Sequence, residues 1–209
     1  MTSSLALFSR NFIKHPRMLG SLIPSSRFLV NRLLDQVDWG RAGTIVEYGP
    51  GVGTFTAEIL RRLPPDGNLV AIDTNRDFAR YLSRTLRDDR LHVIEGSAAD
   101  ARENLQERGL GRADYVISGI PYSTMPSELR SRILRTTHDL LQPDGAFLVY
   151  QFTRAVLPHL RQVFSHVQQE FEPRNIMPAR LFYCRPSSDR RNGNGRREAR
   201  PKARTASET

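Results

Sequence analysis

An acidic residue and three glycines stand at alternate positions in segment 47–53 (EYGPGVG). Gly49, Gly51 and Gly53 let the backbone turn tightly and let a ligand approach the main chain where a Cβ would obstruct it. The G-x-G-x-G spacing differs from the G-x-G-x-x-G of dinucleotide sites. The carboxylate of Glu47 suits a cationic amino group better than a pyrophosphate. The segment therefore predicts a binding loop for such a ligand, with a glycine-rich turn that binds nothing as the alternative.

A second acid, Asp73, ends the apolar run 69–73 (LVAID), 26 residues after Glu47. An acid at the tip of the second strand of an α/β unit is placed to accept hydrogen bonds from both hydroxyls of a ribose. A glycine-rich loop alone is a weak signal. A strand, an acid, glycines, a helix, a second strand and a terminal acid in this order indicate a nucleotide-binding site.

The segment 118–122 (SGIPY) follows the expected fourth strand and is the candidate site for the group that reacts. Backbone carbonyls beside Pro121 can accept hydrogen bonds from an amine. The ring of Tyr122 can stack on a base or face a developing ammonium cation. Tyr122, or a water that it orders, is also a candidate base, and an ordinary turn aromatic after a proline is the alternative.

Short apolar runs alternate with helical patterns along the chain, and these elements must position the loops. The runs lie at 44–48, 69–73, 91–95, 114–118 and 146–152, and the helical patterns near 54–63, 76–87, 98–108, 127–141 and 155–164. This alternation predicts an α/β fold, a mostly parallel sheet with helices on both faces. Segments 167–172 and 179–184 predict a final hairpin with an antiparallel strand. A further helix is expected before the sheet, with Ser25 or Ser26 as its N-cap.

The formal charge of +9 over 209 residues suggests an anionic partner, either nucleic acid or a membrane surface. Residues 41–184 carry only +1, whereas residues 1–40 carry +3 and residues 185–209 carry +5. Residues 4–14 form an amphipathic helical pattern. The tail 186–209 has no apolar periodicity, and we expect it to be disordered. The position of the charge favours a bilayer.

The composition argues against several classes of protein. The single cysteine, Cys184, rules out a disulfide framework and favours a reducing compartment. No apolar run reaches the roughly 20 residues that span a bilayer, and the first residues lack the apolar core of a secretory signal. We therefore expect a cytoplasmic protein. The five histidines have no ligand-like spacing with one another or with Cys184, which predicts no metal site.

Residues 40–185 resemble the S-adenosylmethionine-dependent methyltransferases with the Rossmann-like seven-stranded sheet, whose last strand is antiparallel. The resemblance rests on the loop 47–53, on Asp73 and on the terminal hairpin. It implies S-adenosylmethionine as the cofactor, with Glu47, Gly49, Gly51 and Gly53 around its methionine part and Asp73 on its ribose. The other cofactor residues that it implies are Tyr48, Thr74, Gly96, Ser97, Ala98 and Ser118. Asp100 is expected either at the adenine amine or only as an acid at a helix N-terminus.

The Ile-Pro-Tyr at 120–122 resembles the Asn-Leu-Pro-Tyr loop of amine-directed methyltransferases, including the ribosomal RNA adenine dimethyltransferases. This implies that the catalytic loop consists of Gly119, Ile120, Pro121 and Tyr122. Gly119 stands where those enzymes have Asn, so no side-chain amide is available there for an adenine amino group. We expect a roomier and less base-specific acceptor site.

Segments 13–27 and 174–180 resemble parts of the bacterial phospholipid N-methyltransferases, which methylate phosphatidylethanolamine toward phosphatidylcholine. With the cofactor loops, this resemblance covers most of residues 5–185 and is the preferred family assignment. It implies an N-terminal helix on the inner membrane surface, with contacts from Leu5, Phe8, Arg10, Phe12 and Lys14. It also implies substrate contacts from Arg17, Ser25, Arg27 and Arg180, since a guanidinium grips phosphate in a bidentate manner.

The sequence is therefore interpreted as an N-methyltransferase that acts on a phospholipid amine by direct in-line transfer, with positioning supplying much of the rate. The expected division is helices at 1–38, the methyltransferase domain at 39–185 and the basic tail at 186–209. The alternative is an rRNA adenine-N6 methyltransferase, which the basic termini favour and Gly119 disfavours. A catalytically silent protein that binds membrane or RNA is a third hypothesis, and the intact loop and Asp73 argue against it.

Overall fold

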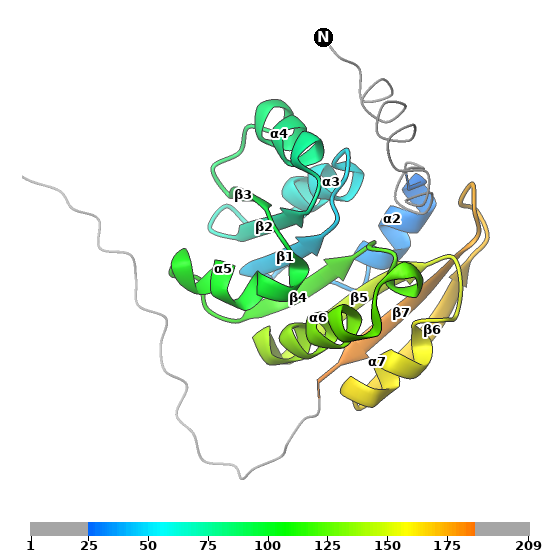
Figure 1. The fold of residues 1–209 in the computed structure, drawn as a ribbon. Coiled ribbons are helices and arrows are strands. Elements are labelled where there is room, and N and C mark those ends of the chain that lie inside the picture. The colour runs from blue at the N-terminus through cyan, green and yellow to red at the C-terminus, as the bar shows by residue number, and fades with distance from the viewer. Residues whose placement is uncertain (1–24, 187–209) are drawn as a thin grey trace, which may run out of the picture.

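The computed structural model of the protein describes residues 25–186 as a seven-stranded sheet in the order β3-β2-β1-β4-β5-β7-β6 (Figure 1). The strands are β1 (Thr44–Tyr48), β2 (Asn68–Asp73), β3 (Leu91–Glu95), β4 (Ala113–Ser118), β5 (Leu141–Gln151), β6 (His166–Glu172) and β7 (Ala179–Arg185). Strands β1 to β5 pair in parallel. Strand β7 is antiparallel to both β5 and β6. The predicted mostly parallel sheet with a reversed last strand is confirmed.

Helices cover both faces of the sheet (Figure 1). On one face lie α2 (Arg27–Leu34), α3 (Thr54–Arg62) and α4 (Arg76–Thr85), and on the other lie α5 (Ala101–Glu107), α6 (Ser127–Leu140) and α7 (Leu157–Val163). Two short 3-10 helices, η2 (Ala98–Asp100) and η3 (Tyr122–Thr124), precede α5 and α6. Helices on both faces follow from right-handed crossovers between parallel strands.

The two faces of the sheet have separate cores because successive side chains of a strand point to opposite sides. In β1, Ile45 packs with α2 and α3, while Val46 packs with the core that holds α5 and α6. All five residues of β1 are buried. The same alternation sends Glu47 to the α3 face, where it meets Thr56, and Tyr48 to the α6 face, where it meets Thr137.

Helix α2 is fixed to the sheet at its start and along one side. The Ser26 side chain caps it by accepting a hydrogen bond from the Leu29 amide at 3.2 Å. Arg32, on the side of the helix, pairs with Glu170 and Glu172 of β6. The prediction that Ser25 or Ser26 caps this helix is therefore confirmed for Ser26.

The largest difference from the predicted boundaries lies between α6 and β5. Helix α6 ends at Leu140 and β5 begins at Leu141, so the predicted helix 127–141 and strand 146–152 are separated by no loop. The pairing of β5 with β4 shifts register where residues 142–145 are inserted. Pro143 has no amide hydrogen for a ladder. Because turn-forming residues lie inside this strand, the sequence pattern did not predict its early start.

Several predictions fall on residues 1–24 and 187–209, which lie outside the described residues. These are the membrane contacts of Leu5, Phe8, Arg10, Phe12 and Lys14, the substrate contact of Arg17, and the basic tail. Within residues 25–186, no helix is long and apolar enough to cross a membrane.

Candidate cofactor and acceptor site

A pocket of about 220 Å³ opens at the carboxyl ends of β1, β2, β3 and β4. Its lining consists of Gly49, Gly51, Ile72, Asp73, Thr74, Phe78, Gly96, Ser97, Ala98, Gly119, Ile120, Pro121, Met125, Leu129 and Ile133. Ligands of open α/β sheets bind at this edge, where chain connections leave a central strand in opposite directions. Here β1 lies between β2 and β4, so the loops after all three strands meet at one place.

The glycine loop presents main chain to this pocket. Gly49 has a φ of +71°, and a Cβ on it would come within 2.7 Å of the Ile120 side chain. Gly51 also has a positive φ and lines the pocket. Gly53 has a different part: it caps α3 in the left-handed conformation, and a Cβ there would collide with Leu82 of α4. The structure thus brings Gly49 and Gly51 to the pocket and uses Gly53 for helix packing.

Asp73 lines the pocket with a buried carboxylate. One oxygen accepts a hydrogen bond from the Gly51 amide at 3.1 Å, and the other accepts from the Asn75 amide at 2.8 Å. Burial raises the pKa of Asp73, and the two amides oppose that rise. Each carboxylate oxygen has a second lone pair, so the group can still accept two hydrogen bonds from a diol.

Glu47 lies behind the glycine loop and is nearly inaccessible to solvent. The Thr56 hydroxyl donates a hydrogen bond of 2.7 Å to its Oε2. Burial raises the pKa of Glu47 to about 8, against the effect of Thr56 and with a smaller contribution from the charge of Asp73. A cationic group bound nearby favours the ionised form, so the arrangement suits an ammonium ligand.

The far side of the pocket combines predicted and unpredicted residues. Thr74, Gly96, Ser97 and Ala98 line it as their positions after β2 and β3 suggested. The unpredicted lining residues are Ile72, Phe78, Met125, Leu129 and Ile133. Leu129 and Ile133 lie four residues apart on α6, and Met125 precedes that helix. The sequence offers no means to distinguish an apolar helix face that lines a ligand site from one that faces a core.

Asp100 does not line the pocket, which disagrees with the first of the two roles expected for it, a contact with the adenine amine. Its carboxylate forms an ion pair with Arg132 of α6. Asp100 is the N-cap residue of α5, although its side chain makes no capping hydrogen bond. Its place at the helix start therefore agrees with the other expectation.

The acceptor loop lines the pocket through Gly119, Ile120 and Pro121, but the carbonyls beside the proline are already engaged. The Ile120 carbonyl accepts hydrogen bonds from the Tyr122 amide and the Gln151 side chain. The Pro121 carbonyl accepts from the amide and the hydroxyl of Thr124. A carbonyl oxygen has two lone pairs, so neither group has one left for an amine. The prediction that these carbonyls bind the amine is wrong.

The carbonyl of Gly119 is the exception in this loop. The Gly119 amide donates to the Tyr48 carbonyl, continuing the pairing of β4 with β1. Continued by two residues along β1, that parallel pattern would pair the Gly119 carbonyl with the amide of residue 50, which is a proline and has no N–H. Among residues 25–186, no donor is found for this carbonyl.

Tyr122, Ser118 and Tyr48 need correction as site residues because their side chains point to the α6 face of the sheet. Tyr122 is fully buried, its ring packs edge-on to Phe147, and its hydroxyl bonds Ser118 at 3.0 Å. The Tyr48 hydroxyl accepts a hydrogen bond from Thr137. Burial raises the pKa of Tyr122 well above its ordinary value. It can therefore neither stack on a nucleobase nor act as a general base that accepts a proton.

The expectation of extra room at Gly119 is also wrong. A Cβ built on Gly119 would overlap the Tyr150 hydroxyl and come within 2.7 Å of the ring carbon Cε1. The side chain of Tyr150, on β5, thus fills the space that an Asn at position 119 would use. Tyr150 was not among the predicted residues, since only the pairing of β4 with β5 brings it to the loop.

Three predicted substrate residues, Ser25, Arg27 and Arg180, fall within the described range, and none of them lines the pocket. The Ser25 side chain lies beside the Tyr150 hydroxyl and opposes the rise of its pKa. Arg27 stacks over the Phe28 ring at 5.0 Å, and Arg180 stacks over Phe171 at 5.3 Å. The two sequence segments that carry these residues meet, because the Ser26 amide donates to the Asn175 side chain at 2.8 Å.

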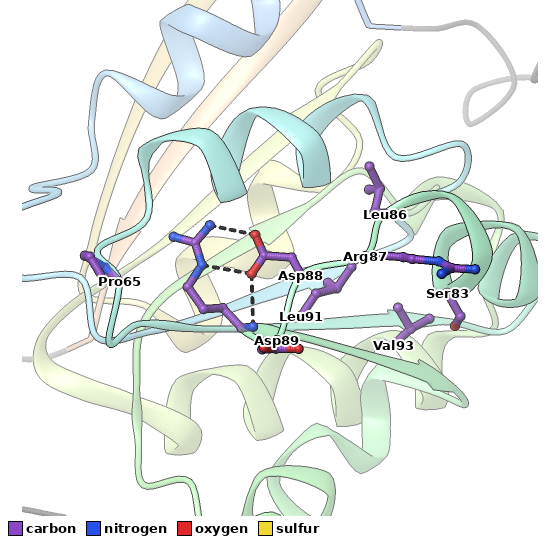
Figure 2. A pocket seen from close by; sticks show the side chains of 9 residues that line it. Pro65, Ser83, Leu86, Arg87, Asp88, Asp89, Leu91 and Val93 are labelled. Carbon is purple, nitrogen blue, oxygen red and sulfur yellow. Dashed lines mark hydrogen bonds and ion pairs between the residues drawn. The ribbon is translucent and has the colours of Figure 1, made fainter.

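Figure 2 shows a second hollow, near the start of β3 and the loop before β2. It is open to solvent and is lined by Pro65, Ser83, Leu86, Arg87, Asp88, Asp89, Arg90, Leu91 and Val93. Arg90 pairs with Asp88 and donates to the carbonyls of Leu60 and Leu63. Arg90 therefore ties the end of α3 to β3, and its charge is already neutralised.

Within the described range 25–186, no group of three or more His, Cys, Asp or Glu side chains could hold a metal ion. Cys184 is buried in the core with Phe147 and Phe182.

Comparisons with known proteins agree with this geometry. A family model described as a methyltransferase domain matches residues 45–145. An ornithine lipid N-methyltransferase from Singulisphaera acidiphila is 35% identical over 86% of this chain and 94% of its own length. Ribosomal RNA small subunit methyltransferase A from Mycoplasma mycoides is 29% identical over 62% of this chain and 47% of its own length. The fold of human methyltransferase-like protein 13 in complex with SAH matches with a TM-score of 0.56 at 16% identity, covering 85% of this chain and 83% of that one.

The pocket fits the cofactor that such enzymes use. Gly49 and Gly51 present main chain to the pocket, and Asp73 retains acceptors for a ribose diol. With the family model, the relative matched over nearly its whole length and the sheet order, these features lead to one conclusion. The chain belongs to the S-adenosylmethionine-dependent methyltransferases, and S-adenosylmethionine is its cofactor.

Proposed function

We propose that this protein methylates the primary amine of a lipid head group at a membrane surface. The observation that carries the proposal is its similarity to an ornithine lipid N-methyltransferase along nearly the whole of that enzyme. Phosphatidylethanolamine, suggested by segments 13–27 and 174–180, and ornithine lipid share an amine close to an anionic group. That shared chemistry defines the substrate class.

For the cofactor, Gly49 and Gly51 contact the methionine part and Asp73 binds the ribose. Gly96, Ser97 and Ala98 border the adenine. Glu47 pairs with the amino group of the methionine part, which lowers its pKa from the raised value of the free protein. Phe78 and Leu129 add apolar surface on either side of the pocket.

For the reaction, the bound cofactor supplies a methyl group already activated by its sulfonium. The chain has to hold the acceptor nitrogen in line with that methyl and to accept its N–H groups. The Gly119 carbonyl, for which residues 25–186 offer no donor, is the group that we assign to this task. Ile120 and Pro121 shape the loop. Tyr122 is buried, so its hydroxyl is not available to take the proton from the ammonium.

For membrane contact, an apolar and cationic surface lies at the same edge of the sheet as the pocket. It consists of Phe28, Phe171, Ile176 and Met177, all exposed, with Arg27, Arg174 and Arg180 beside them. Ile176 is 76% exposed at the β6–β7 turn. Apolar tips with arginines favour the interface of an anionic bilayer. This surface supports a peripheral association of the protein with the membrane.

The decisive experiment incubates the purified protein with labelled S-adenosylmethionine and one of three acceptors. These are vesicles with phosphatidylethanolamine, vesicles with ornithine lipid, and undermethylated ribosomal RNA. Label in either lipid supports the proposal and identifies the head group. Label in RNA alone contradicts it and favours the alternative, an rRNA adenine-N6 methyltransferase, to which the similarity over 62% of the chain also points.

The membrane surface has a separate test. Ile176→Asp places a charge at the turn and is expected to reduce sedimentation with anionic vesicles, while cofactor affinity stays unchanged. Gly111→Asp is the matched control, because Gly111 has open space around it and precedes β4 at the opposite edge of the sheet. Equal sedimentation of both variants and the wild type would remove this surface from the proposal.

A further inference from the structure

Tyr150 lies between the cofactor loop and the acceptor loop. It is the residue before the last one of β5, and its ring stacks on Phe55 at the start of α3, with ring centroids 5.1 Å apart. It points to the same face of the sheet as Glu47, whose charge affects its pKa. The phenol therefore extends toward the junction of the two loops.

The hydroxyl of Tyr150 occupies the space that a side chain at position 119 would need. Any Cβ at position 119 would overlap this hydroxyl. Gly119 lines the pocket, and its own carbonyl has no donor among residues 25–186. A phenylalanine would give the same stack on Phe55, so stacking alone does not account for a polar atom at this place.

The hydroxyl remains a neutral hydrogen-bonding group. Burial raises the pKa of Tyr150 to about 12, although the Ser25 side chain opposes that rise. A phenolic hydroxyl can donate once and accept through its lone pairs. The neighbouring Ser25 side chain can use at most one of these capacities, which leaves at least one lone pair for a further donor.

We propose that Tyr150 binds the methyl acceptor: its hydroxyl oxygen takes an N–H of the head-group amine beside the Gly119 carbonyl. This inference rests on the proposed function, since it requires an amine as the acceptor. Two oxygens fixed on neighbouring strands hold a neutral primary amine by its two N–H groups, so that its lone pair faces the methyl group; the N–CH3 bond forms as the sulfonium S–CH3 bond breaks. The two oxygens also occupy the place of an Asn amide, so the site selects an aliphatic amine over the planar amino group of adenine.

The test is Tyr150→Phe, which keeps the ring and its stack on Phe55 and removes only the hydroxyl. With vesicles of the lipid that the wild type methylates, kcat/KM for lipid should fall about tenfold to a hundredfold, as expected for a hydrogen bond to a charged or reacting group. The Kd of S-adenosylmethionine, measured by calorimetry, should stay within about twofold, since the lost bond belongs to the acceptor.

Two control variants separate binding from structure. Tyr183→Phe removes a hydroxyl that bonds Glu170 on the neighbouring strand and should keep wild-type kcat/KM. Ser25→Ala removes the hydroxyl beside that of Tyr150 and should cost less activity than Tyr150→Phe. A loss in Ser25→Ala equal to that in Tyr150→Phe would show that the hydroxyl only anchors Ser25, and the proposal would be abandoned.

The outcomes also distinguish this proposal from the proposed function. Lipid methylation by the wild type together with wild-type kcat/KM in Tyr150→Phe overturns the role of Tyr150 and leaves the function standing. A wild type that methylates RNA and neither lipid overturns both. A Tyr150→Phe variant that loses cofactor affinity as much as activity also overturns the acceptor role.

Discussion

The two halves of the pocket are built in different ways. On the cofactor side, Gly49, Gly51 and Asp73 come from two consecutive strands and the loops directly after them. On the acceptor side, the contacts join distant positions: Gln151 to Ile120, Tyr150 to Gly119, and Asn175 to Ser26, which is 149 residues away in the chain. The first side is mostly main chain, and the second depends on side chains.

This difference predicts different sensitivity to mutation. A binding loop made of glycine main chain should tolerate no added side-chain atom, because both the glycine conformation and the space beside it are required. Side-chain contacts between distant elements can be removed one at a time, and each removal costs one hydrogen bond or one packing contact. Acceptor chemistry should therefore be separable from cofactor binding by single substitutions.

The largest effect is expected for Gly49→Val. A branched side chain at a φ of +71° is strained and collides with Ile120, so the cofactor Kd should rise on the order of a hundredfold, about 2.8 kcal/mol. Gly109→Val is the control, since Gly109 has a φ of +64° with no atom near its Cβ position. It should bind the cofactor like the wild type. Calorimetric titration of both variants measures the Kd of the cofactor. Equal Kd values would refute the role of the Gly49 main chain in cofactor binding.

The next effect concerns the fit of Gly119 against Tyr150. Gly119→Ala should lower the free energy of unfolding by about 1–3 kcal/mol, because the added Cβ displaces a packed ring. Combined with Tyr150→Leu, the loss should be smaller than the sum of the single losses by about 1 kcal/mol or more. Urea unfolding of the two single variants and the double variant measures the coupling. The pair Gly119→Ala and Tyr183→Leu is the control and should be additive; additivity in both pairs would contradict the steric fit.

A smaller effect is expected for Glu47, which lies behind the glycine loop on the cofactor side. Burial raises the pKa of Glu47 to about 8 in the free protein, and a bound ammonium lowers it. Cofactor affinity should therefore increase as the pH rises toward about 8, by up to about tenfold per pH unit, because the carboxyl loses its proton on binding. The stability of the free protein should decrease over the same rise, since the folded form holds the proton more tightly than the unfolded chain. Glu47→Gln should abolish both trends, and an unchanged pH slope in this variant would exclude Glu47 as their source.

The smallest effect is expected at the anchor of the β6–β7 hairpin. Hydrogen bonds from Arg174, and then from Arg32, lower the pKa of the buried Glu172 to about 2. Its contribution to stability is therefore present above about pH 4.5 and is lost as the pH falls toward 2. Glu172→Gln should cost about 1–2 kcal/mol at pH 7, because exposed arginine partners are screened by solvent. Thermal unfolding measures this, with Glu107→Gln, which removes an exposed charge, as the control. Equal stability of the two variants would argue against the anchor.

Much of the fold could be predicted because its signals are local. The apolar runs of β1 to β4 stand at their predicted positions to within one residue. The side chain of Ser26 caps α2 by accepting a hydrogen bond from Leu29, only three residues later in the chain. The early start of β5 could not be predicted, since Pro143 and Gly145 read as a turn until the pairing with β4 is known.

The sequence by itself determined the alternation of strands and helices, and with it the edge of the sheet where Glu47, Asp73 and the glycines gather. Only the tertiary structure decided which face each strand-end side chain joined. A period of two residues divides side chains between two faces but does not say which face holds a ligand. Tyr122 looked like the tyrosine of the acceptor site and packs in the core, while Tyr150, 28 residues later in the chain, reaches Gly119 because β5 pairs with β4.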